Sequence, residues 1–266
     1  MKDNFGDRMK KYERLETERK FIPLLPIYAR IDGRGFSKFT KGLKRPYDSR
    51  LTLIMSEVTK MLVEKTNALL GYTQSDEISL LWHSEDPKSE MFFDGKVQKM
   101  TSVIASLTTS LFMQECIVLL GQEYFDKTPH FDCRVFQLPN KIEATNVFLW
   151  REQDATKNAI SMAARCYYSH KSLQGVSSSE MQELLFQKGI NFNDYDPCFK
   201  RGSFYRKEEY EIDSSELDDV PEEYRPEGKV TRNKVMRLHM PKFSTVLNRE
   251  GVIFNGETPI TTPNIT

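Results

Sequence analysis

The chain has 266 residues, of which 38 are Lys or Arg and 38 are Asp or Glu, so its formal net charge is zero. This length suits one large domain, alone or with a substantial extension, and the balanced charge gives no electrostatic argument for nucleic-acid binding. The four cysteines and four histidines are scattered without the spacing of a zinc site. No apolar run approaches a membrane span of roughly 18 residues, and the N-terminus lacks the apolar core of a signal peptide. We therefore expect no zinc, no membrane contact and a cytoplasmic location.

Hydrophobic periodicity and turn residues divide the first half of the chain into helices and strands. The expected elements, in chain order, are a charged helix over 7–20, a strand over 27–31, a helix over 50–70, two strands over 72–74 and 78–82, a helix over 95–120 and a strand over 131–138. Gly33 and Gly35 break the first strand. Ser75-Asp76-Glu77 forms the turn between the two central strands, because Ser and Asp favour turns.

The order strand, helix, strand, strand, helix, strand is that of the ferredoxin-like split βαβ fold, which is also the core of a polymerase palm. We therefore predict an α+β protein with a ferredoxin-like βαββαβ palm and an N-terminal helix over residues 1–138. Residues 139–266 are expected to form a helical and β extension packed on the same domain. In it we expect helices over 147–169 and 177–188, a strand over 199–205 and a charged mobile loop over 213–233.

Two aspartates stand where apolar strands end or turn, Asp32 before Gly33 and Asp76 in the hairpin. In a palm the first strand and the hairpin can be neighbours, so the two carboxylates could converge. Magnesium prefers oxygen ligands and usually takes one or two protein carboxylates, with nucleotide phosphates completing its shell. Two such ions can stabilise both oxygens of an in-line displacement. We predict that Asp32, Asp76 and the Gly33 carbonyl hold two Mg²⁺ ions for nucleotidyl transfer, although each segment taken singly is more typical of an ordinary turn.

Glu77 completes the set of catalytic candidates with Asp32 and Asp76. It could support the metal ligands from behind, or it could face solvent beside the turn. The segment from Gly33 to Ser37 would present backbone N–H groups to a triphosphate.

Lys96 and Lys99 share one helix face and could reach the same triphosphate from the other side, although exposed lysines are nearly as good an explanation. Arg45 is a weaker candidate for phosphate binding, as are Lys44 and Arg30.

Several segments together resemble the tRNA-His guanylyltransferase family. They are Asp32-Gly33-Arg34-Gly35-Phe36, Asp48-Ser49-Arg50, Gln74-Ser75-Asp76-Glu77, Lys99-Met100-Thr101-Ser102, Phe131-Asp132-Cys133-Arg134-Val135, Trp150-Arg151, Lys200-Arg201-Gly202-Ser203 and Glu227-Gly228-Lys229. The resemblance implies a palm fold, two Mg²⁺ ions at Asp32, the Gly33 carbonyl and Asp76, and nucleotide binding by residues 32 to 37 and by Ser75-Asp76. It also implies a homotetramer that activates a tRNA 5′-monophosphate with ATP or GTP and then extends the 5′ end, in the 3′-to-5′ direction.

The chain departs from the eukaryotic members of this family at one motif. Where they carry His-Ile-Asn-Asn-Leu-Tyr-Asn, this chain has Thr156-Lys157-Asn158-Ala159-Ile160-Ser161-Met162, and a family lysine is replaced near Met181. These changes resemble the bacterial and archaeal "like protein" branch. That branch favours templated repair of 5′-truncated tRNA over addition of a single G to tRNA-His.

Two alternatives stay open from the sequence. A nucleotide cyclase on the same palm would also hold two metals near a strand and a hairpin, although the chain lacks a Gly-Gly-Asp/Glu-Glu-Phe hairpin. A non-catalytic RNA-binding module would leave the acidic turns as mere turns.

Overall fold

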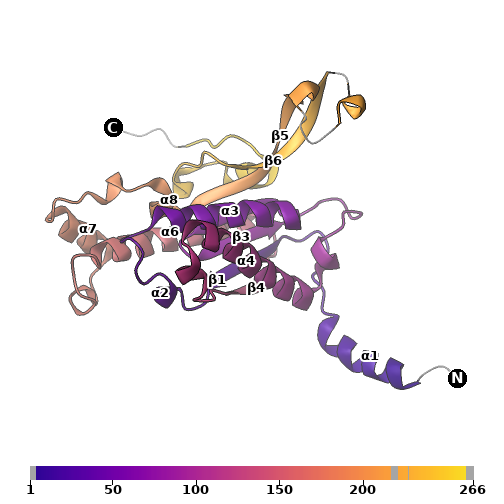
Figure 1. Ribbon diagram of the computed structural model, residues 1–266, viewed down its shortest axis with the longest axis horizontal. Helices are drawn as coiled ribbons and strands as arrows, with labels where there is room; N and C mark the ends of the chain where they lie inside the picture. Colours follow the sequence, from indigo (N-terminus) through magenta and orange to yellow (C-terminus); the bar gives the residue numbers. More distant parts are fainter. Residues whose placement is uncertain (1–3, 217–220, 227, 262–266) are drawn as a thin grey trace.

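The centre of the molecule is one six-stranded antiparallel sheet with the strand order β4-β1-β3-β2-β5-β6 (Figure 1). The computed structural model describes residues 4–216, 221–226 and 228–261. Its strands are β1 Ile27–Gly33, β2 Leu70–Gln74, β3 Glu77–Trp82, β4 Phe131–Gln137, β5 Ser203–Asp213 and β6 Lys229–Arg237. The first four strands stand in the order 4-1-3-2, which confirms the predicted ferredoxin-like palm.

Helices cover both faces of the sheet, because successive residues of each strand point to opposite sides. On one face, Ile27, Ala29 and Ile31 of β1 share a core with helices α3 (Ser49–Thr66) and α4 (Val97–Leu119). On the other face, Tyr28 packs with Phe148 of α6 (Lys141–Ala164). Figure 1 shows α3 and α4 in front of the sheet and α6 behind it.

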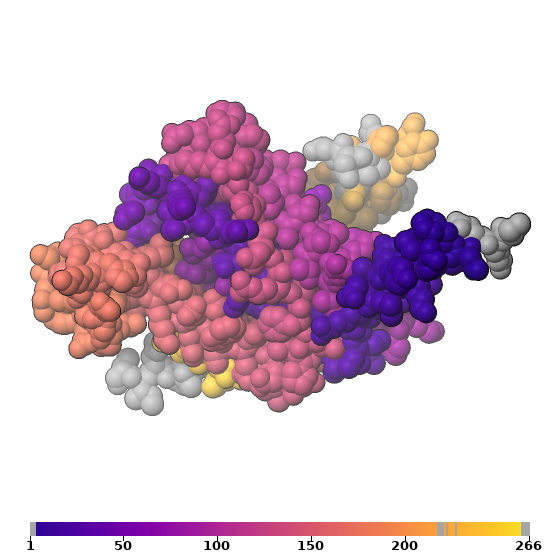
Figure 2. Space-filling view, turned by 90° about the horizontal axis from the view of Figure 1, so that it is seen from below, coloured from indigo at the N-terminus to yellow at the C-terminus, as the bar shows by residue number. Residues whose placement is uncertain are grey.

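The remaining helices are shorter or peripheral. They are α1 Asn4–Thr17, α2 Phe36–Phe39, α5 Gln122–Phe125, α7 Ser178–Phe186 and α8 Pro197–Arg201. None of the described residues of α1 is buried, and this helix extends from the body as an arm (Figures 1 and 2).

The C-terminal extension continues the palm sheet, since β5 pairs with β2 and then with β6. The strand expected over 199–205 is corrected: residues 197–201 form α8, and β5 begins at Ser203 and continues to Asp213. The loop expected over 213–233 is also wrong at its C-terminal end, where β6 begins at Lys229 and pairs with β5 along its length. Residues 217–220 and 227 of that stretch lie outside the described residues. The division of the chain near residue 138 stays a prediction.

Helix α6 begins six residues earlier than the predicted start at 147. The Asn140 side chain accepts a hydrogen bond from the Glu143 N–H at 2.8 Å and so caps the helix. Helix α4 corrects another expectation, because it is long and apolar enough to span a membrane by length and composition. Its buried residues Met100, Ile104 and Phe112 pack in the core against the sheet.

Candidate active site

The end of β1 and the β2–β3 hairpin lie side by side, which brings the Asp32 and Asp76 segments together. Asp32 stands opposite Glu77 in the β1–β3 register. The N–H of Gly33 donates a hydrogen bond to the Asp76 carbonyl oxygen, with N and O 3.1 Å apart. Ser75 makes the turn tight with a left-handed φ of 53°. The predicted adjacency of the first strand and the hairpin is confirmed.

The electrostatic environment of Asp76 favours a bound cation. Burial raises the pKa of the Asp76 carboxyl above its ordinary value, and the negative charge of Asp32 adds to the rise, against hydrogen bonds from its own N–H and from the Ser75 hydroxyl. The Ser75 Oγ lies 3.1 Å from Asp76 Oδ1. Two carboxylates that repel each other in a partly buried turn form a favourable place for a divalent ion, whose charge would offset the repulsion.

Asp132 is a third acidic residue at this edge of the sheet. It stands opposite Asp32 in the β1–β4 register, and its carboxylate lies 3.6 Å from the Arg134 guanidinium. Our sequence analysis did not include it in the site. The ferredoxin order, which places the fourth strand beside the first, is the signal that could have found it.

The segment after Asp32 folds back tightly onto the core. A Cβ added at Gly33 would lie 2.3 Å from the Phe36 ring, so this position requires glycine. Gly35 has a left-handed φ of 69° and stands at the N-cap of α2. The first N–H groups of α2, on Phe36 and Ser37, have no partner within that helix. The Arg34 side chain is exposed, while its N–H donates to the His130 carbonyl at 3.0 Å.

A cavity of about 350 Å³ opens beside Asp76. Four of the predicted site residues line it together with Asp76: Phe36, Ser37, Arg45 and Ser75. Lys44 and Arg165 add further positive charge to the wall, and Tyr47 stacks on Phe199 with ring centroids 4.6 Å apart and planes at 15°. Such a wall can hold an aromatic base on its apolar side and phosphates on its cationic side. Asp32, Gly33, Arg34 and Gly35 lie outside this wall, at the adjoining end of β1.

Three aromatic or cationic residues of this wall were not among the predicted site residues: Tyr47, Arg165 and Phe199. Arg165 follows the end of α6, and Phe199 belongs to α8. No local pattern relates either to the Gly33–Ser37 segment, because only the packing of the C-terminal extension on the sheet brings them there.

Lys99 does not line this cavity, so its predicted role in nucleotide binding stays a prediction. Its ammonium stands 4.7 Å from the centre of the Phe93 ring, near the start of α4. Helix α4 contacts the sheet near Gly33 through Thr109, whose hydroxyl accepts a hydrogen bond from the Phe131 N–H at 3.2 Å. Ten residues of helix separate Lys99 from Thr109, about 15 Å at the usual rise per residue.

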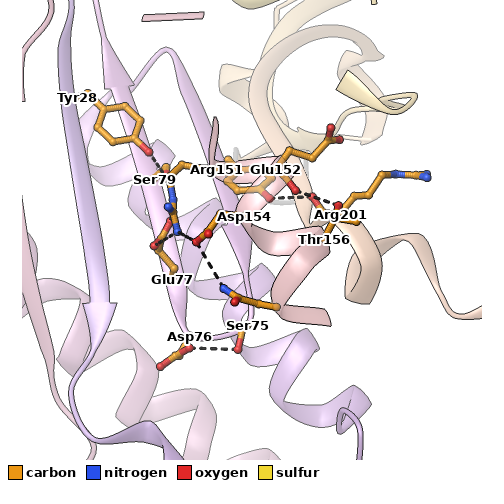
Figure 3. Close-up of polar contacts among 12 residues, drawn as sticks. Tyr28, Ser75, Asp76, Glu77, Ser79, Arg151, Glu152, Asp154, Thr156 and Arg201 are labelled. Carbon is orange, nitrogen blue, oxygen red and sulfur yellow. Dashed lines mark hydrogen bonds and ion pairs between the residues drawn. The ribbon is translucent and has the colours of Figure 1, made fainter. Parts of the chain in front are cut away.

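Glu77 makes a bidentate ion pair with Arg151 of α6 (Figure 3). The two N···O distances are 2.6 and 2.7 Å, and Arg151 also donates to Asp154 at 3.1 Å. Both members of the Glu77–Arg151 pair are largely buried, with side chains 14% and 10% exposed. A planar fork of this kind fixes the carboxylate in one orientation. Glu77 therefore ties the hairpin to α6 directly behind Asp76.

Comparison with known proteins decides the family. A family model described as "Thg1: tRNAHis guanylyltransferase" matches residues 6–139. The tRNA(His) guanylyltransferase of Schizosaccharomyces pombe is 32% identical over 218 residues, which cover 75% of this chain and 79% of the relative. The chain belongs to the tRNA(His) guanylyltransferase family. It is therefore a nucleotidyltransferase.

Solved structures of this family share the fold. A bacterial Thg1-like protein in complex with ATP is 38% identical, with a TM-score of 0.71, over 76% of this chain and 88% of that one. A bacterial Thg1-like protein in complex with GTP is 31% identical, also with a TM-score of 0.71, over 91% and 94% of the two chains. The Saccharomyces cerevisiae tRNA(His) guanylyltransferase is 27% identical, with a TM-score of 0.63. The TM-scores to the two bacterial proteins exceed that to the yeast enzyme, which agrees with the predicted "like protein" branch.

Proposed function

We propose that this protein is a Mg²⁺-dependent nucleotidyltransferase that adds nucleotides to the 5′ end of tRNA in the 3′-to-5′ direction. The observation that carries the proposal is the hydrogen bond from Gly33 to Asp76, which joins the two acidic segments beside a cavity with cationic walls. Family membership supports the direction of addition and the tRNA substrate.

The residues at the turn suit magnesium. Asp32, Asp76 and the Gly33 carbonyl offer hard oxygen donors, and no group of three or more His, Cys, Asp or Glu side chains that could hold a metal occurs among the described residues. Two carboxylates are the usual protein share for Mg²⁺, which takes its other ligands from phosphates and water. When bound, Mg²⁺ would neutralise charge on the phosphates and favour in-line displacement. Glu77, held by Arg151, would keep the hairpin that carries Asp76 in place.

The nucleotide substrates would be ATP and GTP, which two structurally similar bacterial proteins bind. In this chain the stacked Tyr47 and Phe199 rings would contact a base. Arg45 and Arg165 would contact phosphates, together with the N–H groups at the start of α2. Catalysis would then come mainly from positioning and from charge neutralisation at phosphorus, as is usual in phosphoryl transfer.

Templated repair of 5′-truncated tRNA is the favoured form of this activity. It is supported by the likeness to bacterial Thg1-like proteins and by Thr156 and Lys157, which replace the first residues of the eukaryotic motif. Addition of one G to tRNA-His is the narrower variant. The family assignment lends no support to the cyclase or to the non-catalytic RNA-binding module.

A labelled-nucleotide assay tests the proposal. The protein is incubated with labelled GTP, ATP, Mg²⁺ and either a 5′-truncated tRNA or a tRNA-His that lacks its extra G. Extension by several templated nucleotides supports repair, whereas one added G on tRNA-His alone supports the narrower activity. A cyclic nucleotide product, or no incorporation with either tRNA, would contradict the proposal.

We further propose that the protein acts in the cytoplasm as a homotetramer. Helix α1 supports self-association, since it carries exposed Phe5, Tyr12 and Leu15 and buries none of its described residues within the chain. Deleting residues 1–17 should then lower the molar mass measured by light scattering. An unchanged tetramer would remove α1 from the interface, and a monomeric full-length protein would contradict the tetramer itself.

A further inference from the structure

A second cavity, of about 500 Å³, lies at the opposite end of the sheet from the Asp76 turn. Its wall includes the end of β3 at Trp82 and His83, the residues before β2, and Arg206 and Lys207 of β5. Strand β3 runs from the turn to this cavity over six residues, which corresponds to roughly 20 Å at the usual rise of a strand. The cavity is therefore separate from the active site.

Three polar nitrogen atoms in this wall are buried without a hydrogen bond to any of the described residues. They are both ring nitrogens of His83 and the Nε of Arg206. Arg206 is 8% exposed, so its Nε–H is withdrawn from bulk water. A buried donor without an acceptor destabilises a folded protein, and native structures leave few such groups unsatisfied. An acceptor in the cavity would satisfy the Arg206 Nε–H and the one ring N–H of a neutral His83.

The charge of Arg206 is not balanced at close range. One of its terminal nitrogens donates to the Ile253 carbonyl, and no ion pair of Arg206 with a carboxylate occurs among the described residues. Burial lowers the pKa of the guanidinium, against the charge of Glu208, but arginine stays protonated in proteins. Lys65 and Lys207 add positive charge to the wall, against Glu90. An anion is thus the ligand that this wall favours.

His83 and Arg206 project from the same face of the sheet. Both contact the same C-terminal segment, since His83 packs against Phe254 and Arg206 donates to the Ile253 carbonyl, and Ile253 and Phe254 belong to one hydrophobic core. Strands β3 and β5 flank β2, and the register places Arg206 level with Leu81, two residues before His83, so the two backbone positions are roughly 12 Å apart. An arginine and an imidazole at that separation can converge on one group a few ångströms wide. His83 is also held edge-on against Phe254, with ring centroids 5.3 Å apart.

We propose that this cavity is a second phosphate-binding site, in which Arg206 and His83 donate hydrogen bonds to the oxygens of one phosphate group. Arginine suits phosphate because its fork of N–H groups matches the oxygens. Burial and Lys141 lower the pKa of His83, so the imidazole is neutral at pH 7 and donates from one ring nitrogen. The phosphate comes either from an RNA backbone or from a free phosphorylated molecule, and the two sources share this chemistry.

Tryptophan fluorescence can report binding in this cavity. It has two tryptophans, of which Trp82 lies in this wall while Trp150 lies near Arg151. In a Trp150→Phe background, fluorescence therefore reports Trp82 alone. The protein is titrated with inorganic phosphate and, separately, with tRNA. EDTA is present in both titrations, which removes metal-dependent binding at Asp32 and Asp76 from the signal.

Three variants complete the test. Arg206→Met removes the buried guanidinium, His83→Phe keeps the ring beside Phe254, and Arg237→Met is the matched control on the neighbouring strand, where the side chain is exposed and outside this wall. We expect a saturable Trp82 change whose affinity falls at least tenfold in Arg206→Met and in His83→Phe, and stays within twofold in Arg237→Met. His83→Phe keeps the test decisive if Arg206→Met does not fold.

The two titrations identify the source of the phosphate. A response to tRNA at far lower concentration than to phosphate, with competition between them, assigns the site to the RNA backbone, whereas a response to phosphate alone assigns it to a free anion. No saturable response to either ligand, or equal affinity in both cavity variants and the control, would overturn the proposal. Because no nucleotide is incorporated, these results do not depend on the proposed catalytic function.

Discussion

Replacing Asp76 with Asn tests two separate properties of this residue: its role as a metal ligand in catalysis and its effect on the stability of the fold. The substitution keeps the shape of the side chain but removes the charge next to Asp32. A metal ion acting as a Lewis acid contributes several kcal/mol to a transition state, and about 4 kcal/mol corresponds to roughly a 10³-fold change in rate. We expect Asp76→Asn to lower nucleotide incorporation by about that factor.

The same substitution should stabilise the metal-free protein. The pKa of Asp76 is raised in the folded state by burial and by Asp32, so the ionised form opposes folding at neutral pH. Each unit of such a rise corresponds to about 1.4 kcal/mol. Since Asp76 is partly exposed, we expect a gain on the order of 1 kcal/mol, or about 2 °C in melting temperature. The gain should shrink as the pH falls through the raised pKa towards 3.8.

Single-turnover incorporation of labelled GTP and thermal unfolding in EDTA measure the two effects. Asp126→Asn, an exposed aspartate that follows α5, is the matched control and should change neither. Incorporation by Asp76→Asn within tenfold of the wild-type rate would refute Asp76 as a metal ligand. A melting temperature several degrees below that of the wild type would refute the electrostatic account of the turn.

Three further substitutions test the surroundings of the site. Arg151→Met leaves Glu77 as a buried unpaired charge and should lower the free energy of unfolding by about 3–5 kcal/mol, measured with urea. The double variant with Glu77→Gln should recover most of this loss. No recovery would contradict the pairing of Glu77 with Arg151. Asp48→Asn should cost about 1 kcal/mol at pH 7, because Arg50 hydrogen bonds lower the Asp48 pKa to about 2. That difference should persist above pH 4 and disappear as the pH falls through about 2, and a pH-independent loss in thermal unfolding would contradict it. Tyr47→Ala should raise the KM for nucleotide about tenfold with a smaller change in kcat, as expected for lost aromatic stacking worth about 1–3 kcal/mol; a change in kcat alone would contradict base contact.

The palm was predictable because its signals are local and repeated. Helical apolar spacing fixes α3 and α4, and turn residues at Gly33 and Ser75 delimit the strands that carry the two aspartates. The ferredoxin order then makes the first strand and the hairpin neighbours without further information.

The features that could not be predicted from the sequence depend on contacts between residues far apart in the chain. Glu77 could not be assigned from its neighbours, because its partner Arg151 lies on a helix of the C-terminal extension. The position of Lys99 against Phe93 could not be foreseen, because helical periodicity identifies a shared face but not which end of the sheet that face meets. The β5–β6 hairpin was missed since its charged, exposed residues lack the alternation that marks a half-buried strand.

The pairing of β5 with β2 bears on how far the chain can be shortened. Gly202 lies against the hairpin so closely that a Cβ there would stand 2.5 Å from the Thr73 carbonyl oxygen, and Tyr72 donates its hydroxyl hydrogen to the Arg201 carbonyl. A fragment ending at residue 139, where the match to the family model ends, would lack β5. Strand β2, which is buried along its whole length, would then be an unpaired edge of the sheet. The segment matched by the family model therefore does not complete the sheet by itself, and a shortened chain has to keep β5, the strand that pairs with the hairpin carrying Asp76.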